Sequence, residues 1–177
     1  MQVWDPFVRL VHWSVAACVA VAWISTLDDV GFGPHENAGL LAGALVLGRL
    51  LWGARGQSHA SLRRFVHGPR ATWAYARQVW HGTERRHMGH NPLGGWMALA
   101  LWTCVLALAF TGWLYTTDAF WGEAWLDELH RLLGWCLLGL IAAHLAGVAF
   151  TSRRHGENLV RAMIDGRKPA PGPDDVV

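Results

Sequence analysis

Residues 128–147 read ELHRLLGWCLLGLIAAHLAG and open the last strongly apolar stretch of the chain. From Leu132 to Ser152 there are 21 residues without a formal charge, enough for a helix to cross a bilayer. The stretch nevertheless includes two histidines, His130 and His144. An ionisable residue within a membrane span is costly, so it indicates a function. The fourteen-residue spacing corresponds to about 21 Å of helical rise and places both imidazoles on nearly the same helix face.

The composition favours a membrane protein. Apolar residues make up 53% of the 177 residues and charged residues 16%, and long uncharged stretches alternate with charged ones. The net charge of +2 is too small to indicate nucleic-acid binding. The three cysteines lie in separate apolar stretches and form no Cys-x-x-Cys motif, so we predict neither a disulfide framework nor a c-type haem attachment.

Four stretches have the length and composition of membrane-spanning helices. The first follows Asp5-Pro6, which reads as an N-cap with proline at the first helical position. It carries no formal charge from Leu10 to Leu27. The other three are expected at about 35–52, 91–117 and 128–153.

The basic residues indicate the orientation of these spans. The segment between the second and third spans and the C-terminal tail hold twelve of the fifteen Lys and Arg residues, whereas the other two linkers hold none. Both termini are therefore predicted to face the cytoplasm. We predict an all-α integral membrane protein, a four-helix up-down bundle over residues 1–168, with a disordered tail at 169–177.

Two surface helices are expected outside the spans. In the first, at 69–80, the side chains of Trp73, Ala76 and Trp80 share one face, and two arginines lie elsewhere. This pattern is typical of a helix that lies on the membrane rather than crossing it. The second surface helix is expected at 157–166.

On this topology the histidines of the spans fall at two depths. His12 and His144 lie toward the cytoplasmic side, and His35 and His130 lie near the outer face. Two imidazoles that face each other across a bundle core suit a b-type haem, whose iron accepts one nitrogen on each side. The pattern therefore predicts two haem sites, with His12/His144 and His35/His130 as the pairs of axial ligands.

Small and cationic residues lie near these histidines. A small residue follows three of the four at position i+4, on the same helix face, where it lets a macrocycle approach the backbone. These residues are Ala16, Gly39 and Gly134. Haem propionates need cationic partners, for which Arg9 and Arg49 are the candidates. The third span contains no histidine and is predicted to serve packing, and the histidines of the basic segment are predicted to face solvent or headgroups.

Three other interpretations stay open. A superoxide:quinone oxidoreductase would work at the outer haem, although the acidic outer linkers would repel an anionic substrate. A divalent-metal permease would need carboxylates along its path, and the uncharged stretches of the first, third and fourth spans contain none. A membrane anchor without haem would need no paired histidines.

Several motifs along nearly the whole chain are similar to those of one known family. They are VWDPFVRLVHW at 3–13, HENAG at 35–39, RLLWG at 49–53, GHNPLGG at 89–95, ELH at 128–130 with His144, and ENLVRAMIDG at 157–166. Together they resemble the bacterial cytochrome b561 family, which includes the b-type cytochrome subunits of nickel-iron hydrogenases.

The resemblance implies a multi-pass dihaem cytochrome of the bacterial inner membrane, with axial ligands at His12, His35, His130 and His144. It also implies electron transfer between quinone and a redox partner such as a c-type cytochrome or an attached oxidoreductase, with membrane lipid around the spans. Whether the chain is itself an enzyme, and whether it forms a homo-oligomer, both stay open. No nucleic-acid partner and no catalytic side chain are expected.

Overall fold

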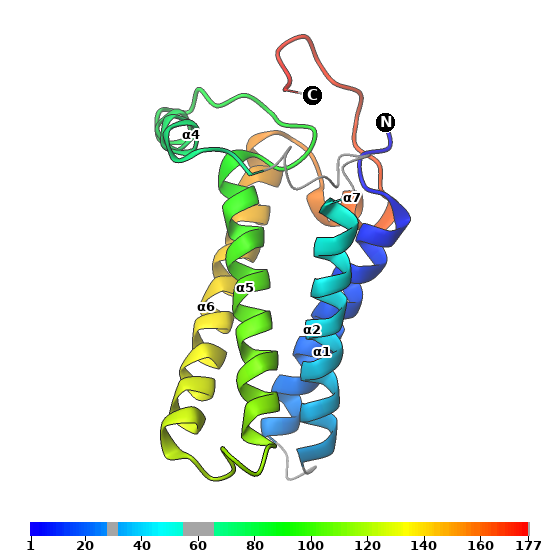
Figure 1. Ribbon diagram of the computed structural model, residues 1–177. Coiled ribbons are helices and arrows are strands. Elements are labelled where there is room, and N and C mark those ends of the chain that lie inside the picture. Colours follow the sequence, from blue (N-terminus) through cyan, green and yellow to red (C-terminus); the bar gives the residue numbers. More distant parts are fainter. Residues whose placement is uncertain (28–31, 55–65, 177) are drawn as a thin grey trace. The chain divides into compact units, whose positions relative to one another are not determined.

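The computed structural model describes residues 1–27, 32–54 and 66–176, which form helices joined by turns and short loops (Figure 1). The four long helices are α1 (Pro6–Leu27), α2 (Phe32–Ala54), α5 (Pro92–Tyr115) and α6 (Ala124–Arg154). The two short ones are α4 (Pro69–His81) and α7 (Leu159–Asp165). Residues 28–31 and 55–65, which include part of the basic segment and its His59, lie outside the described residues.

The four long helices confirm the four predicted spans. Each is at least 22 residues long and apolar enough to cross a membrane. Asp5 caps α1 as predicted, because its Oδ1 accepts a hydrogen bond of 2.8 Å from the amide of Val8. Helix α2 begins at Phe32, before the expected start. Pro34 is tolerated in this helix because it falls in the first turn, where an amide hydrogen has no intrahelical partner.

The described chain divides into two compact units, and each of the long helices contributes to both. We call Met1–Arg9, Leu51–Leu99 and Ala142–Val177 the terminal unit, because it contains both ends of the chain. We call Leu10–Leu50 and Ala100–Ile141 the span unit.

Side chains from all four long helices pack together in the span unit. Its buried cluster consists of Ala42, Val46, Cys104, Val105 and Leu137. Residues of α1, among them Val15 and Val19, pack against this cluster. Helices α2 and α5 approach closely at Gly43, where an added Cβ would lie 2.7 Å from the Cβ of Ala109. A larger residue at Gly43 would therefore force these helices apart.

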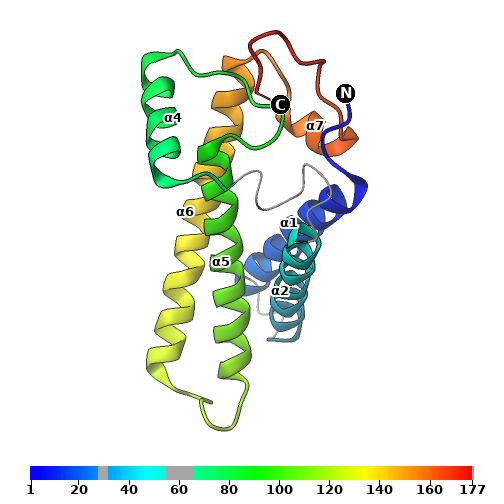
Figure 2. The ribbon, with the colours of Figure 1, turned by 45° about the horizontal axis from the view of Figure 1, so that its top comes forward.

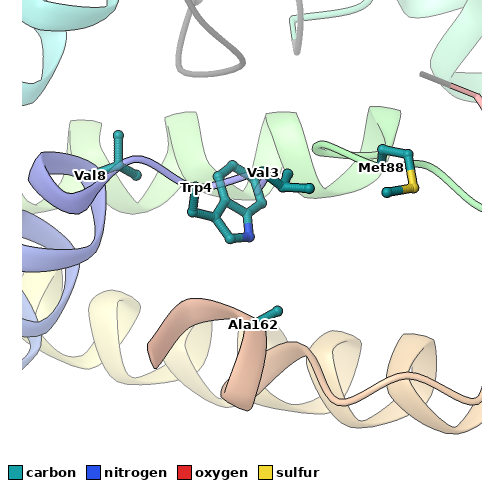
Figure 3. Close-up of a cluster of buried hydrophobic side chains, with 5 residues drawn as sticks. All are labelled: Val3, Trp4, Val8, Met88 and Ala162. Carbon is teal, nitrogen blue, oxygen red and sulfur yellow. The ribbon is translucent and has the colours of Figure 1, made fainter. Parts of the chain in front are cut away.

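In the terminal unit, segments from three parts of the chain share one small core. Figure 3 shows its buried side chains, which are Val3, Trp4, Val8, Met88 and Ala162. The amides of Val3 and Trp4 donate to the carbonyl of Gly166, at 2.8 and 3.2 Å. Gly166 has φ +80°, and an added Cβ would lie 2.7 Å from the carbonyl oxygen of Trp4. Glycine is therefore required where the end of α7 meets the N-terminus.

A buried ion cluster supports this core. The carboxylate of Glu157 accepts hydrogen bonds from Arg86 at 3.0 Å and from Lys168 at 3.2 Å. The side chains of Glu157 and Lys168 are each only 3% exposed. Burial lowers the pKa of Lys168, and the nearby Glu157 carboxylate opposes that effect. Arg86 also pairs with Asp175 at 2.7 Å, so the segment beyond Lys168 is joined to the ion cluster. The predicted boundary at residue 168 stays a prediction.

Helix α4 confirms the first predicted surface helix. It buries Tyr75 on one face and exposes Trp73 and Trp80 on the other, where their exposed fractions are 70% and 86%. Burial, followed by the charge of Glu84, raises the pKa of Tyr75 to about 12.

Both ends of α4 are attached to spans within the terminal unit. Near its start, Thr72 Oγ1 accepts a hydrogen bond from Trp96 Nε1 in the first turns of α5, at 3.1 Å. Just beyond its end, Glu84 accepts one from Arg154, the last residue of α6, at 2.9 Å. Figure 2 shows α4 beside the ends of these two spans.

We expect Glu157→Gln to loosen the contact between α7 and the N-terminus, because it leaves the buried charge of Lys168 without its carboxylate. Losing one partner of a buried ion pair costs about 3 kcal/mol, which is about a hundredfold in an opening equilibrium. Hydrogen exchange at the amides of Val3 and Trp4 measures the change. The control is Asp165→Asn, which alters an exposed ion pair with Arg161. Equal exchange rates in the two variants would contradict the role assigned to the cluster.

We expect the tryptophan face of α4 to lie in the headgroup region of the bilayer. A nitroxide attached through Trp80→Cys should then relax faster with oxygen, which concentrates in lipid, than with a water-soluble nickel chelate. Gln78→Cys provides the control, because this exposed residue lies on another face of the helix. If the two labels respond alike, the helix does not rest on the membrane.

Candidate functional site

The structure brings together one of the two predicted histidine pairs. His35 lies in the first turn of α2 and His130 lies near the start of α6, both within the span unit. Their ring centroids are 5.9 Å apart and the ring planes are inclined by 67°. Both side chains are half-buried. These two imidazoles come from residues 95 positions apart in the chain, so their proximity is a property of the packed helices.

The hydrogen bond of His35 determines which of its nitrogens carries the proton. Its Nδ1 lies 2.9 Å from the carbonyl oxygen of Ala22 in α1. A carbonyl oxygen only accepts, so Nδ1 must be the donor, and the lone pair of the neutral imidazole is then on Nε2. This is the tautomer that a metal ligand bound through Nε2 requires.

His130 has a corresponding contact with the third span. Its Nδ1 lies 2.8 Å from Oγ1 of Thr111, a buried residue of α5. The same hydroxyl lies 2.9 Å from the carbonyl oxygen of Ala107, to which it donates its single hydrogen. The oxygen can then accept from Nδ1 of His130, which again leaves the lone pair on Nε2.

This contact corrects the expectation that the third span serves packing alone. Sequence reasoning missed Thr111, because threonine hydroxyls in membrane helices commonly bond to their own backbone and need no partner elsewhere. A polar residue within an apolar span is the one available signal, and it does not single out Thr111, because the exposed Thr103 of the same span gives the same signal.

Three glycines lie near the two imidazoles. An added Cβ at Gly112 would lie 3.2 Å from Cε1 of His130, so a side chain there would press on the ring. At Gly39, one turn after His35, an added Cβ would meet no atom of the described residues within 4 Å. At Gly134, one turn after His130, it would meet Trp23 at 3.8 Å. The space predicted at Gly39 is therefore present in the structure.

The residues around this pair fit a b-type haem. A bond of about 2 Å between a metal and a histidine nitrogen puts two imidazoles on opposite sides of one ion about 6 Å apart, centre to centre. The observed separation of 5.9 Å agrees with this value. The Nδ1 hydrogen bonds, this separation and the open space at Gly39 are the observations that favour a haem between the two rings.

The other predicted pair is divided between the two units. His12 belongs to the span unit, where its ring contacts Trp13 edge to face at 5.1 Å. His144 belongs to the terminal unit, in the last third of α6. Both side chains are half-buried. The pairing of His12 with His144 therefore stays a prediction.

The two arginines proposed as propionate partners have different surroundings. Arg49 is 3% exposed, and its guanidinium carbon lies 5.3 Å from the ring centroid of Trp102. Arg9 donates from Nη1 to the carbonyl of Ile164, while its buried Nε has no hydrogen-bond partner within the described part of the chain. The propionate roles of Arg9 and Arg49 stay predictions.

Two histidines of the basic segment are not fully solvated, contrary to expectation. The ring of His90 packs edge to face against Trp4 at 4.8 Å, and that of His87 packs against Tyr75 at 5.2 Å. Burial lowers the pKa of His87, partly offset by its hydrogen bond to the backbone of Arg85. Across the described residues, no three His, Cys, Asp or Glu side chains gather as a site for a free metal ion.

Comparison with known protein families identifies a match. A family model described as prokaryotic cytochrome b561 matches residues 3–166, which include all four long helices and the four histidines of the predicted pairs. No curated protein and no solved structure matches the chain.

Proposed function

Because the chain belongs to the prokaryotic cytochrome b561 family and is a membrane electron-transfer protein that binds b-type haem, we propose that two haems carry its electrons. One would be held by His35 and His130, the other by His12 and His144. The observation that carries this proposal is the 5.9 Å separation of the first pair, with both Nδ1 atoms engaged in hydrogen bonds.

Bound haem supplies reversible one-electron chemistry at its iron. The protein's contribution would be to supply an imidazole nitrogen on each side of the iron, so that little would have to move when the charge on the iron changes. Two such ligands would also keep external ligands such as oxygen away. Gly39 leaves open space for the ring, and Gly134 is the proposed point of its approach to α6. Arg9 and Arg49 are the proposed partners of the propionates.

The spacing along α6 sets the length of the electron path. His130 and His144 are fourteen residues apart on this one helix, which corresponds to about 21 Å of rise. With one ligand at each level, α6 contributes to both haem sites. We propose that residues 1–168 form an up-down bundle in the bacterial inner membrane, with both termini in the cytoplasm, as the basic residues indicate.

Quinone is the proposed partner within the membrane, and a c-type cytochrome or another redox protein is the proposed partner outside it. The linker at 118–128 carries four acidic residues and no basic one, so it favours a positively charged docking partner. The same charge would repel superoxide, which makes a superoxide:quinone oxidoreductase the weaker proposal. Family membership does not support a metal permease or a haem-free anchor.

We expect His35→Ala and His130→Ala each to remove the same haem, because each variant deletes one of its two axial ligands. His12→Ala and His144→Ala should each remove the other haem and leave the first in place. The measurement is haem per chain together with the reduced-minus-oxidised spectrum of each purified variant. His155→Ala, in the tail, is the matched control and should retain both haems. If His12→Ala and His35→Ala removed the same haem, the pairing would be wrong.

A further inference from the structure

We propose that Thr111 is a positioning residue for the His35/His130 haem site. Its hydroxyl would hold the imidazole of His130 in the tautomer and ring orientation that present Nε2 to the iron. It would also set how strongly that imidazole donates electrons to the metal. This inference rests on the proposed function, because it assumes that His130 is an axial ligand.

The direction of the hydrogen bond follows from the count of protons. The hydroxyl of Thr111 has one hydrogen, and two backbone carbonyls of its own helix compete for it, those of Ala107 at 2.9 Å and Leu108 at 3.2 Å. Its oxygen is thereby left as an acceptor toward Nδ1 of His130 at 2.8 Å. Thr111 is thus connected on one side to α5 and on the other to the histidine of α6.

The surroundings make this contact strong. Thr111 is 5% exposed, so water does not compete effectively for either partner. Gly112, the next residue, lies against Cε1 of the same imidazole and limits where the ring can move. The ring is therefore held at Nδ1 by a hydrogen bond, and the absence of a side chain at Gly112 leaves the space that its Cε1 edge occupies.

The two ligands of this site differ in how their tautomer is set. His35 donates to a backbone carbonyl, which no substitution removes and which cannot reverse its role. His130 depends on a hydroxyl, which is both a donor and an acceptor. Removing that hydroxyl therefore perturbs one axial ligand while the hydrogen bond of the other stays intact.

The expected effects have a clear sign. An acceptor at Nδ1 increases the electron density on the ligand nitrogen and stabilises the oxidised iron. Thr111→Val keeps the shape of the side chain and deletes the acceptor. It should raise the midpoint potential of the His35/His130 haem and weaken its retention by about 10- to 100-fold, the usual range for such an outer partner. The other haem should keep its potential.

The test compares variants of the full-length purified protein by potentiometric titration, by the rate of haem transfer to a soluble acceptor, and by the low-spin ferric EPR spectrum. The EPR spectrum responds to the orientation of the two imidazole planes. Thr111→Ser restores a hydroxyl and should return all three readouts toward wild type. Thr103→Val makes the same exchange at an exposed position of α5 and should change none of them. If Thr111→Val does not accumulate, Thr111→Ala provides the same comparison.

Two results would overturn the inference. Either Thr111→Val has the potential, EPR spectrum and haem retention of Thr103→Val, or Thr111→Ser is as altered as Thr111→Val. In both cases the proposed function would stand as long as His130→Ala loses one haem. Retention of both haems by His130→Ala would instead refute the proposed function itself.

Discussion

The structure depends on satisfying imidazoles that have been placed inside membrane spans. A histidine there has lost water from both ring nitrogens, and each nitrogen needs another partner. At His35 and His130 the protein supplies a hydrogen-bond acceptor to Nδ1 in both cases, and the two rings lie 5.9 Å apart. What remains on each ring is one nitrogen whose lone pair suits a metal. The imidazole nitrogens that are unfavourable inside the spans therefore lie where a haem could bind them.

This requirement explains why four helices take part although only two of them carry the proposed ligands. Helix α2 carries His35, and α1 supplies the carbonyl of Ala22 that orients it. Helix α6 carries His130, and α5 supplies Thr111. Close packing of α2 and α5 at Gly43 belongs to the same arrangement, because the hydrogen-bonding helices must approach their neighbours. Electron transfer needs such rigidity, because ligands that move little when the charge of the iron changes keep the reorganisation energy small.

The four spans and one histidine pair were predictable from the sequence, because a bilayer restricts which chain segments can cross it. Charge-free length identified the four spans, and matching the depths of the histidines selected His35 and His130 without any knowledge of side-chain packing. Thr111 was not predictable, because its role depends on the rotation of α5 about its own axis, which an evenly apolar helix does not reveal. The same holds for His90, whose contact with Trp4 depends on how the terminal unit folds. The surface helix at α4 was recognisable because its faces differ in sequence.

The central claim is that this chain holds two haems on four histidines. The most direct measurement is the number of b-type haems per chain in the purified wild-type protein, determined together with its reduced-minus-oxidised spectrum. The account predicts two haems per chain, both low-spin with two nitrogen ligands in the oxidised and the reduced state. One haem per chain would remove one of the two histidine pairs, and a colourless protein would contradict the account as a whole.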